Sequence, residues 1–344
     1  MRTHLNICIP TFNRSDYLIE ALNSFEKDTL EKYYNLINIY ISDNASTDDT
    51  ETAVSQYKSK TSLNIQYIKQ KYNKGALVNL FEAVKMIEDK TGHFWLFGDD
   101  DKINKGSIER IFYEINENEI DILLMNRIIC DINLNPIRND SYFKDKKDVQ
   151  FIIRNDEDYI KYLKSIKTLD GLMCFISSII GGPNLLNFII QELEQDNFYK
   201  QNLFPHTYFI HKYIRQNANV RIHYLSKPLI YWRGDNTSKD GRTMKINSMM
   251  NYEEQIQIAI KVIKNRNVLK EYLNVIKNTY HIGRHLYYTI GSDKDEIEYN
   301  RYIVFLLRFN IFFAYYLSLL EIVIVVYKYI KMSLLYFTGH PKKS

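Results

Sequence analysis

The chain has 344 residues, of which 45% are hydrophobic and 25% charged, a balance typical of a folded globular protein. Its 45 basic and 41 acidic residues give a net charge of +4, too small for the strongly basic face of a nucleic-acid-binding protein. The three cysteines, Cys8, Cys130 and Cys174, are far apart and lack metal-ligand spacing, so we expect reduced thiols in a cytoplasmic protein. The amino terminus lacks a long apolar segment, so no secretory signal is expected.

Apolar runs alternate with helical patterns in the first part of the chain. The runs predict strands at 5–10, 36–42, 63–69, 93–98 and 121–126. Helical spacing of apolar residues predicts helices at 15–25, 46–57, 75–87 and 107–115. Ser15 is placed to cap the first of them. Mostly apolar strands that alternate with helices predict an α/β fold with a parallel sheet.

The second half of the chain is less regular. Its patterns predict helices at 159–166, 184–194, 207–216, about 248–264 and 268–290. The run at 172–180 is a buried strand or helix, and 220–225 and 228–234 resemble a closing pair of strands. We therefore divide the chain into a first half of the main domain at 1–130, a second half at 131–245 and a helical extension at 246–344.

Three consecutive aspartates, Asp99, Asp100 and Asp101, follow the apolar run at 94–97. Adjacent carboxylates repel one another, and the apolar residues that precede them reduce their contact with solvent. Keeping all three ionised therefore costs free energy unless a cation neutralises them. A hard divalent cation with oxygen ligands is the natural candidate, and a solvated acidic turn is the alternative.

Polar loops also follow the strands at 5–10 and 36–42. Ligands of parallel α/β sheets bind beyond the carboxyl ends of the strands, so the three loops predict one binding site. Neither G-x-G-x-x-G nor G-x-x-x-x-G-K-[ST] occurs, so a glycine-rich loop does not hold the phosphates of any nucleotide bound here.

Four motifs stand in order along the chain: ICIPTFNRSDYLIEALNSF, ISDNASTDDT, YNKGALVNL and LFGDDD. Together they resemble the family 2 glycosyltransferases with a GT-A fold, well over 4–130 and loosely over 131–240. The residues of these motifs are most similar to those of bacterial transferases that build O-antigen, lipooligosaccharide or capsule, including the abequosyltransferase-like branch. The resemblance implies a Rossmann-like, mostly parallel GT-A domain, with a nucleotide-sugar-binding half at 1–130 and an acceptor-binding half at 131–245. It also implies metal-dependent, inverting transfer of a sugar to a hydroxyl of a growing, lipid-linked surface glycan.

The resemblance implies a role for each matching residue. The residues implied to contact the nucleotide sugar are Thr11, Asn13, Arg14, Asp43, Asn73, Lys74, Gly75, Asp99 and Asp100. Asp43 would accept hydrogen bonds from the base, and Asp99 and Asp101 would hold Mn²⁺ or Mg²⁺, with Asp101 the direct ligand. Separately from the resemblance, the glycines and short polar residues of 233–242 give this loop few contacts, so we expect a lid from which Arg233 or Arg242 reaches the diphosphate, with an ordinary surface hairpin as the alternative.

Several of these residues also have plain structural explanations. Asn13 and Asn44 could be turn formers, and Lys74 could be a surface charge. Asp48 and Asp49 more naturally serve the start of a helix, and Trp95 belongs in a core.

The general base is the point at which the sequence departs from the family. Many members have an acidic pair opening a helix, and the matching position here falls near His206 in LFPHTYFIHKYI. A histidine has an ordinary pKa of about 6.5 and can do the same work. Asp170 is the competing base, and the sequence favours His206 slightly.

The apolar stretch at 302–337 is interrupted by Arg308, Glu321, Lys328 and Lys331. This pattern suits an interfacial helix on the inner face of the cytoplasmic membrane, near a lipid-linked acceptor. A packing helix that forms a homodimer is the alternative.

Two other functions stay open at this stage. One is a metal-dependent nucleotidyltransferase on a similar sheet, although PTFNRSD lacks the glycines of its first loop. The other is a non-catalytic, membrane-associated protein that binds a nucleotide sugar, against which the intact aspartates count.

Overall fold

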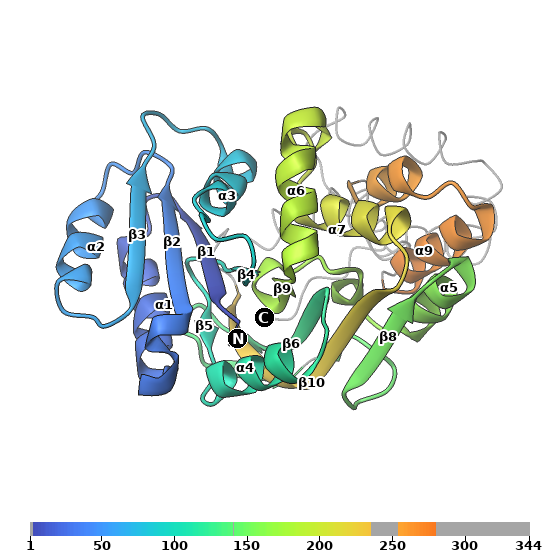
Figure 1. Ribbon diagram of the computed structural model, residues 1–344, viewed down its shortest axis with the longest axis horizontal. Helices are drawn as coiled ribbons and strands as arrows, with labels where there is room; N and C mark the ends of the chain where they lie inside the picture. The colour runs from blue at the N-terminus through green and yellow to red at the C-terminus, as the bar shows by residue number, and fades with distance from the viewer. Residues whose placement is uncertain (1–2, 140, 235–253, 280–344) are drawn as a thin grey trace, which may run out of the picture.

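A computed structural model describes residues 3–139, 141–234 and 254–279 of the chain. Within these residues the strands form one sheet in the order β3-β2-β1-β4-β9-β6-β10-β5, with β7 beside β6 and β8 beside β10 (Figure 1). Helices cover both faces of the sheet, so the fold is the α/β class that the sequence predicts.

The parallel half of the sheet comes from the first part of the chain. Its strands are β1 (Leu5–Thr11), β2 (Ile37–Asp43), β3 (Asn64–Lys69) and β4 (His93–Leu96). The helices of this half are α1 (Ser15–Asp28), α2 (Thr50–Lys58), α3 (Ala76–Lys85) and α4 (Ser107–Glu117), with a 3₁₀ turn at Glu31–Leu36. Because β1 lies between β2 and β4 and is parallel to both, the loops that follow these three strands meet at one edge.

The other half of the sheet is mixed. Its strands are β5 (Lys102–Ile103), β6 (Ile122–Cys130), β7 (Pro136–Asn139), β8 (Val149–Ile153), β9 (Ile179–Gly181) and β10 (Val220–Arg233). β9 is antiparallel to both β4 and β6 and joins the halves, while β6 and β10 are parallel. The helices are α5 (Asp156–Ser165), α6 (Pro183–Gln195) and α7 (Pro205–Gln216), with 3₁₀ turns at Leu169–Leu172, Ile176–Ser178 and Phe198–Lys200.

Two details of the sequence prediction are wrong. The expected pair of strands at 220–225 and 228–234 is one strand, β10, with an irregular register between Leu225 and Ile230. Pro228 cannot donate a ladder hydrogen bond, and the irregularity accommodates it without ending the strand. Ser15 does not cap α1 with its side chain; instead, Asp48 of the neighbouring loop accepts a hydrogen bond from the Ser15 amide at 3.2 Å.

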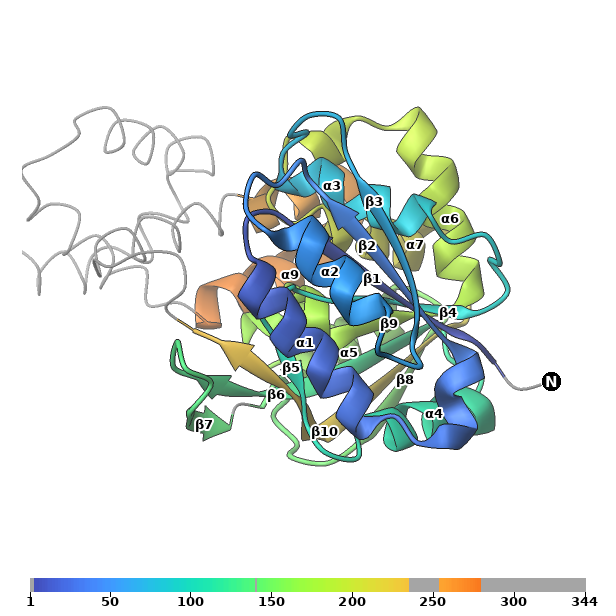
Figure 2. The same ribbon diagram turned by 90° about the vertical axis from the view of Figure 1, so that its left-hand side faces the viewer.

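The strands alternate between two cores, one on each face of the sheet. Along β1, Leu5, Ile7 and Ile9 join the core beneath α1, α2 and α4, whereas Cys8 joins the opposite core with α3 and α5–α7. Figure 2 shows α1 and α2 side by side over β1–β3. Trp95 is fully buried in the first core, between Phe25 and Phe97, as the sequence predicts.

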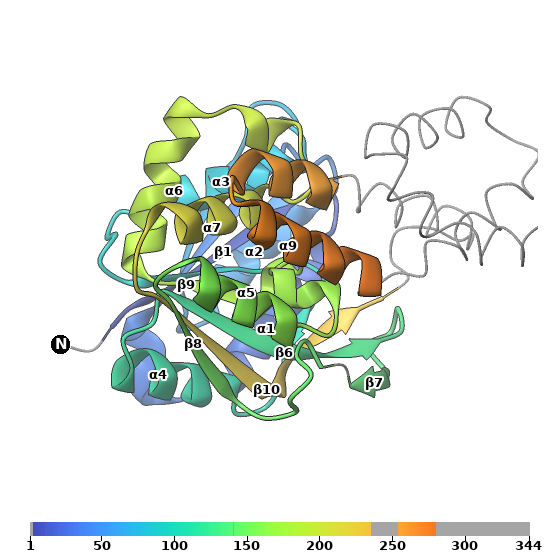
Figure 3. The ribbon, with the colours of Figure 1, turned by 90° about the vertical axis from the view of Figure 1, so that its right-hand side faces the viewer.

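The described part of the helical extension packs on the second core. It consists of helical residues 254–262 and α9 (Arg266–Thr279), which lies against α5 and α7 (Figure 3). None of the helices in the described ranges is long and apolar enough to cross a membrane. The loop at 235–242 with Arg242 and the apolar tail at 302–337 lie outside those ranges, so the expected lid and membrane helix stay predictions.

Gly181 of β9 leaves room for the ring of Phe94, its partner residue on the neighbouring strand β4. A Cβ atom at this position would lie 2.2 Å from Cε1 of Phe94 and 3.0 Å from Cδ2 of Leu185. We predict that Gly181→Ala lowers the free energy of unfolding by about 1–3 kcal/mol, the usual cost of overpacking. Urea unfolding measures this change.

The double variant Gly181→Ala/Phe94→Leu tests the cause. A smaller side chain at 94 makes room for the methyl group, so the two changes together should cost less than the sum of their separate costs. Strict additivity would contradict the clash with Phe94.

Candidate functional site

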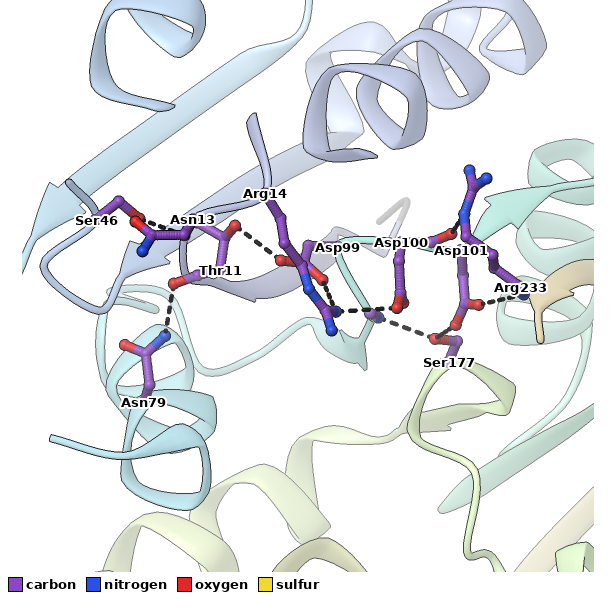
Figure 4. Close-up of polar contacts among 11 residues, drawn as sticks. Thr11, Asn13, Arg14, Ser46, Asn79, Asp99, Asp100, Asp101, Ser177 and Arg233 are labelled. Atoms are coloured by element: carbon purple, nitrogen blue, oxygen red, sulfur yellow. Dashed lines mark hydrogen bonds and ion pairs between the residues drawn. The ribbon is translucent and has the colours of Figure 1, made fainter. Parts of the chain in front are cut away.

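The carboxyl ends of β1 and β4 bring the aspartate cluster against the first polar loop (Figure 4). Thr11 donates a hydrogen bond from Oγ1 to Oδ2 of Asp99 at 2.8 Å. Nη1 of Arg14 lies 3.1 Å from Asp99 and 3.0 Å from Asp100, so one guanidinium bridges two carboxylates. These contacts place Thr11 and Arg14 beside the cluster, as the sequence predicts for residues of one site.

Asp101 is held from two other segments. Ser177 Oγ donates to its Oδ2 at 2.5 Å, and the backbone N–H of Arg233 donates to its Oδ1 at 3.1 Å. Ser177 Oγ also accepts the N–H of Gly98 at 2.9 Å. A Cβ atom at Gly98 would lie 3.0 Å from the Asp101 carboxylate, so the glycine leaves room for the cluster to fold back on itself.

The cluster carries more negative charge than its surroundings compensate. Burial, followed by repulsion from Asp100, raises the pKa of Asp99 to about 6, although Arg14 acts in the opposite direction. The same two causes raise the pKa of Asp101 well above its ordinary value, against the hydrogen bond from Ser177 and the charge of Arg127. Asp99 and Asp101 are only 5% and 2% exposed, so solvent does little to offset this charge. A bound cation would remove the excess.

Hydrogen bonds join the loop after β2 to the loop after β1. Asn13 has a left-handed backbone with φ of 51°, which asparagine tolerates, and its Oδ1 accepts the Thr47 N–H at 2.7 Å. Its own N–H donates to Ser46 Oγ at 2.9 Å. Asp43 is fully buried and accepts hydrogen bonds from the Ser46 N–H and the Tyr67 hydroxyl. Asn13 therefore forms a turn here, and the contacts of Asn13 with the nucleotide and of Asp43 with a base stay predictions.

The segment around Asn73 is anchored to the end of β2. Asn44 donates to Asn73 Oδ1 and accepts the Lys74 N–H, both at 2.8 Å. The Lys74 ammonium lies 2.7 Å from Glu82 on α3, an intramolecular ion pair rather than a free surface charge. Gly75 precedes α3 with φ of 85°, a conformation that side chains with a Cβ disfavour. This segment lies next to the loop of Asp43, and its contact with a nucleotide stays a prediction.

The guanidinium of Arg233 is buried beneath the cluster. It donates to the backbone oxygens of Asp100 and Ile132, pairs with Glu20 and lies 4.4 Å from the centre of the Tyr17 ring. Arg233 is only 4% exposed, so reaching a diphosphate would require these contacts to break. That contact stays a prediction.

Comparisons with known proteins identify the family. The family model described as glycosyl transferase family 2 matches residues 6–177. The abequosyltransferase RfbV of Salmonella typhimurium is 32% identical over 246 residues, which are 70% of this chain and 71% of that protein. The chain belongs to glycosyl transferase family 2. The assignment favours a glycosyltransferase over the nucleotidyltransferase and the non-catalytic binding protein.

Solved structures share the fold of this glycosyltransferase. The 1–349 segment of Staphylococcus aureus TarS has a TM-score of 0.56 at 22% identity, covering 79% of this chain and 71% of that one. The mannosyltransferase PcManGT of Pyrobaculum calidifontis, solved with GDP-Man and Mn²⁺, has a TM-score of 0.53 at 10% identity, covering 95% and 87%. In sequence, TarS, named a poly(ribitol-phosphate) beta-N-acetylglucosaminyltransferase, is 32% identical over 122 residues, only 20% of its length.

The two candidate bases of the transferase lie in different environments. His206 is 3% exposed on α7, and its Nε2 lies 3.1 Å from the backbone oxygen of Cys174. Burial lowers the pKa of His206 to about 4. The side chain of Asp170 is 15% exposed and pairs with Arg127 at 2.8 Å. The burial of His206 argues against a proton-transfer role and favours Asp170.

Sequence reasoning missed several residues that build the site. Ser177 and Arg127 carry no motif of their own, and their roles depend on segments that meet only in the folded chain. Asn79 of α3 donates from Nδ2 to the backbone oxygen of Ser42 at 2.8 Å and to that of Thr11 at 3.4 Å. The signal in the sequence was an asparagine on the apolar face of a predicted helix, because a polar side chain there needs a hydrogen-bond partner.

The buried side chain of His206 on α7 should make the stability of the transferase depend on pH. Between about pH 6.5 and pH 4 the unfolded chain binds a proton at His206 and the folded chain does not, so stability falls as pH falls. The contribution is at most about 1.4 kcal/mol per pH unit. We predict that the free-energy difference between wild type and His206→Gln shrinks across this range.

Urea unfolding at several pH values measures that difference. Shared contributions, including those of Asp99 and Asp101, cancel because both proteins contain them. A difference that stays constant from pH 7 to pH 4 would show that His206 titrates alike in the folded and unfolded chains.

Proposed function

We propose that this glycosyltransferase binds a nucleotide-sugar donor through a divalent metal and transfers the sugar with inversion to a hydroxyl of a bacterial surface glycan. The buried, undercompensated aspartate cluster where the loops after β1, β2 and β4 meet is the observation that carries the proposal. The name of RfbV supports sugar transfer, the name of TarS supports a bacterial polymer as acceptor, and solved neighbours contain UDP, UDP-GlcNAc or GDP-Man.

The residues present fit Mn²⁺ or Mg²⁺. Asp99 and Asp101 offer hard carboxylate oxygens whose charge the protein offsets only in part. Among the residues that the structure describes, no three His, Cys, Asp or Glu side chains form a complete ligand set. This suits a metal that binds one or two carboxylates and completes its shell with substrate phosphates and water. When bound, such a metal stabilises the charge of the departing diphosphate.

The chain's own residues would orient the donor and remove one proton. Thr11 and Arg14 contact the aspartate cluster and would face the nucleotide together with the loop of Asp43. Asp170 lies in the 3₁₀ turn that precedes the turn of Ser177, whose hydroxyl holds Asp101. Asp170 takes the proton of the acceptor hydroxyl as that oxygen bonds to the anomeric carbon. The bond from this carbon to the diphosphate breaks, and the nucleoside diphosphate leaves with the electron pair.

A lipid-linked acceptor at the cytoplasmic face of the membrane is the finer form of this proposal. Its support is the interrupted apolar pattern at 302–337, which suits an interfacial helix. Vesicle flotation of the full chain tests it: binding to anionic vesicles that disappears when 302–344 is removed is the expected result. Equal flotation of both proteins would contradict it.

Metal-dependent donor binding is the central test of the proposal. A donor present at a hundred times its Kd stabilises the folded state by about 2.7 kcal/mol, a shift of a few degrees in melting temperature. We predict such a shift from one of UDP-, GDP-, CDP- or dTDP-sugars with Mn²⁺, and its loss in Asp101→Asn. Differential scanning fluorimetry with and without EDTA measures it.

Asp145→Asn provides the control, because Asp145 is exposed between β7 and β8 and the chemical change is the same. It should keep the full shift. A shift that survives both EDTA and Asp101→Asn would exclude the metal site.

The base is tested by comparing two variants. We predict that Asp170→Asn lowers turnover by roughly 10²–10⁴-fold while the donor Kd stays within about threefold, because a general base acts after binding. His206→Gln, measured at a temperature at which it is folded, should keep most of the turnover. Steady-state kinetics of nucleoside diphosphate release provides the numbers, and the reverse ranking of the two variants would restore His206 as the base.

A further inference from the structure

We propose that Arg127 is a positioning residue that holds the Asp170 carboxylate in a fixed place relative to Asp101. The inference rests on the proposed function, in which Asp170 takes the acceptor's proton and Asp101 belongs to the donor site. Arg127 therefore acts through Asp170 and is not itself expected to contact the reacting atoms.

The pair between Arg127 and Asp170 is close and poorly hydrated. Nη2 of Arg127 lies 2.8 Å from Oδ2 of Asp170, and the two side chains are 9% and 15% exposed. A charge-assisted hydrogen bond of this length is strong and directional. Because Arg127 comes from β6 in the middle of the sheet, it ties the 3₁₀ turn of Asp170 to a rigid strand.

The guanidinium of Arg127 is fixed by two aromatic rings. Its central carbon lies 4.4 Å from the centre of the Phe175 ring and 4.3 Å from that of Trp232. The two rings are inclined at 66° with centres 6.1 Å apart, so they form a corner that the flat cation fills. Arginine stacks on aromatic faces and pairs with a carboxylate at once, which lysine does less well.

The same two segments hold Asp101. Trp232 directly precedes Arg233, whose N–H donates to Oδ1 of Asp101. Phe175 stands two residues before Ser177, whose hydroxyl donates to Oδ2. The corner that fixes Arg127 is thus built on the two segments that hold the donor-site carboxylate. A displacement of Arg127 would change the position of the base relative to the donor, while the two hydrogen bonds that hold Asp101 come from other residues.

The test uses four variants of the full chain with Mn²⁺ and whichever of UDP-GlcNAc, GDP-mannose, CDP-glucose and dTDP-glucose stabilises the wild type most. Water serves as the acceptor, and release of nucleoside diphosphate gives kcat and KM. The variants are Arg127→Met, Arg127→Lys, Asp170→Asn and the double variant Arg127→Met/Asp170→Asn. Arg154→Met is the control, because Arg154 forms an ion pair with Asp158 but its side chain is 59% exposed.

We expect Arg127→Met to lower kcat by roughly 10²-fold or more with donor KM within about threefold, because the base is misplaced while the hydrogen bonds that hold Asp101 remain. Arg127→Lys should recover part of the loss, since it keeps the charge but not the planar stack. In the Asp170→Asn background, Arg127→Met should cost less than threefold further, because residues that act as a unit are not additive.

Two kinetic outcomes overturn the inference in distinct ways. Wild-type kcat in Arg127→Met, or equal losses in both backgrounds, would show that Arg127 does not act through Asp170. A parallel rise in KM would place it in donor binding instead. If Arg127→Met does not fold, because the Asp170 carboxylate has lost the charge of Arg127, the lysine variant and the double variant carry the same comparison. A wild type that neither binds nor cleaves any of the four donors would refute the proposed function first and the inference with it.

Discussion

The repulsion among Asp99, Asp100 and Asp101 is the constraint on which the rest of the site depends. Three carboxylates in sequence at the buried end of β4 cannot be left to solvent, so each has partners from a different segment. The end of β1 supplies Thr11, and Arg14 directly precedes α1. The end of β10 and the turn before β9 hold Asp101. The architecture around the carboxyl edge of the sheet is therefore organised by one electrostatic cost.

That cost also distinguishes the aspartates from the residues that hold the surrounding loops together. Ser46, Asn44 and Asn79 form hydrogen bonds that connect the loops to one another. The guanidinium of Arg233 forms an ion pair with Glu20 and donates hydrogen bonds to the backbone oxygens of Asp100 and Ile132. The preorganised loops leave the aspartates as the groups with unmet electrostatic demand, which is what a binding site for a cation and a diphosphate requires.

The sequence predicts the fold well where local pattern decides it. The strands and helices of the first 130 residues are confirmed because their apolar periodicity is strong and each element is bounded by polar loops. The short strands β5, β7 and β8 were missed, since two to five residues carry too little pattern. The site shows the same division: motifs identify Thr11, Arg14 and the aspartates, but not Ser177 or Arg127. The burial of His206 could not be seen either, because it follows from the packing of α7 on residues 173–174.

The hydrogen bond from the Arg233 amide to Asp101 closes a loop of chain 132 residues long. Closing such a loop carries an entropic cost that is recovered only when most of the sheet has formed, so this contact belongs to a late stage of folding. During synthesis the first four parallel strands can assemble on the ribosome, yet the carboxylate after β4 lacks its last partner until β10 emerges. A nascent chain thus acquires the ordered arrangement of its acidic loop only once nearly all of the sheet has been made, which ties formation of the site to completion of the fold.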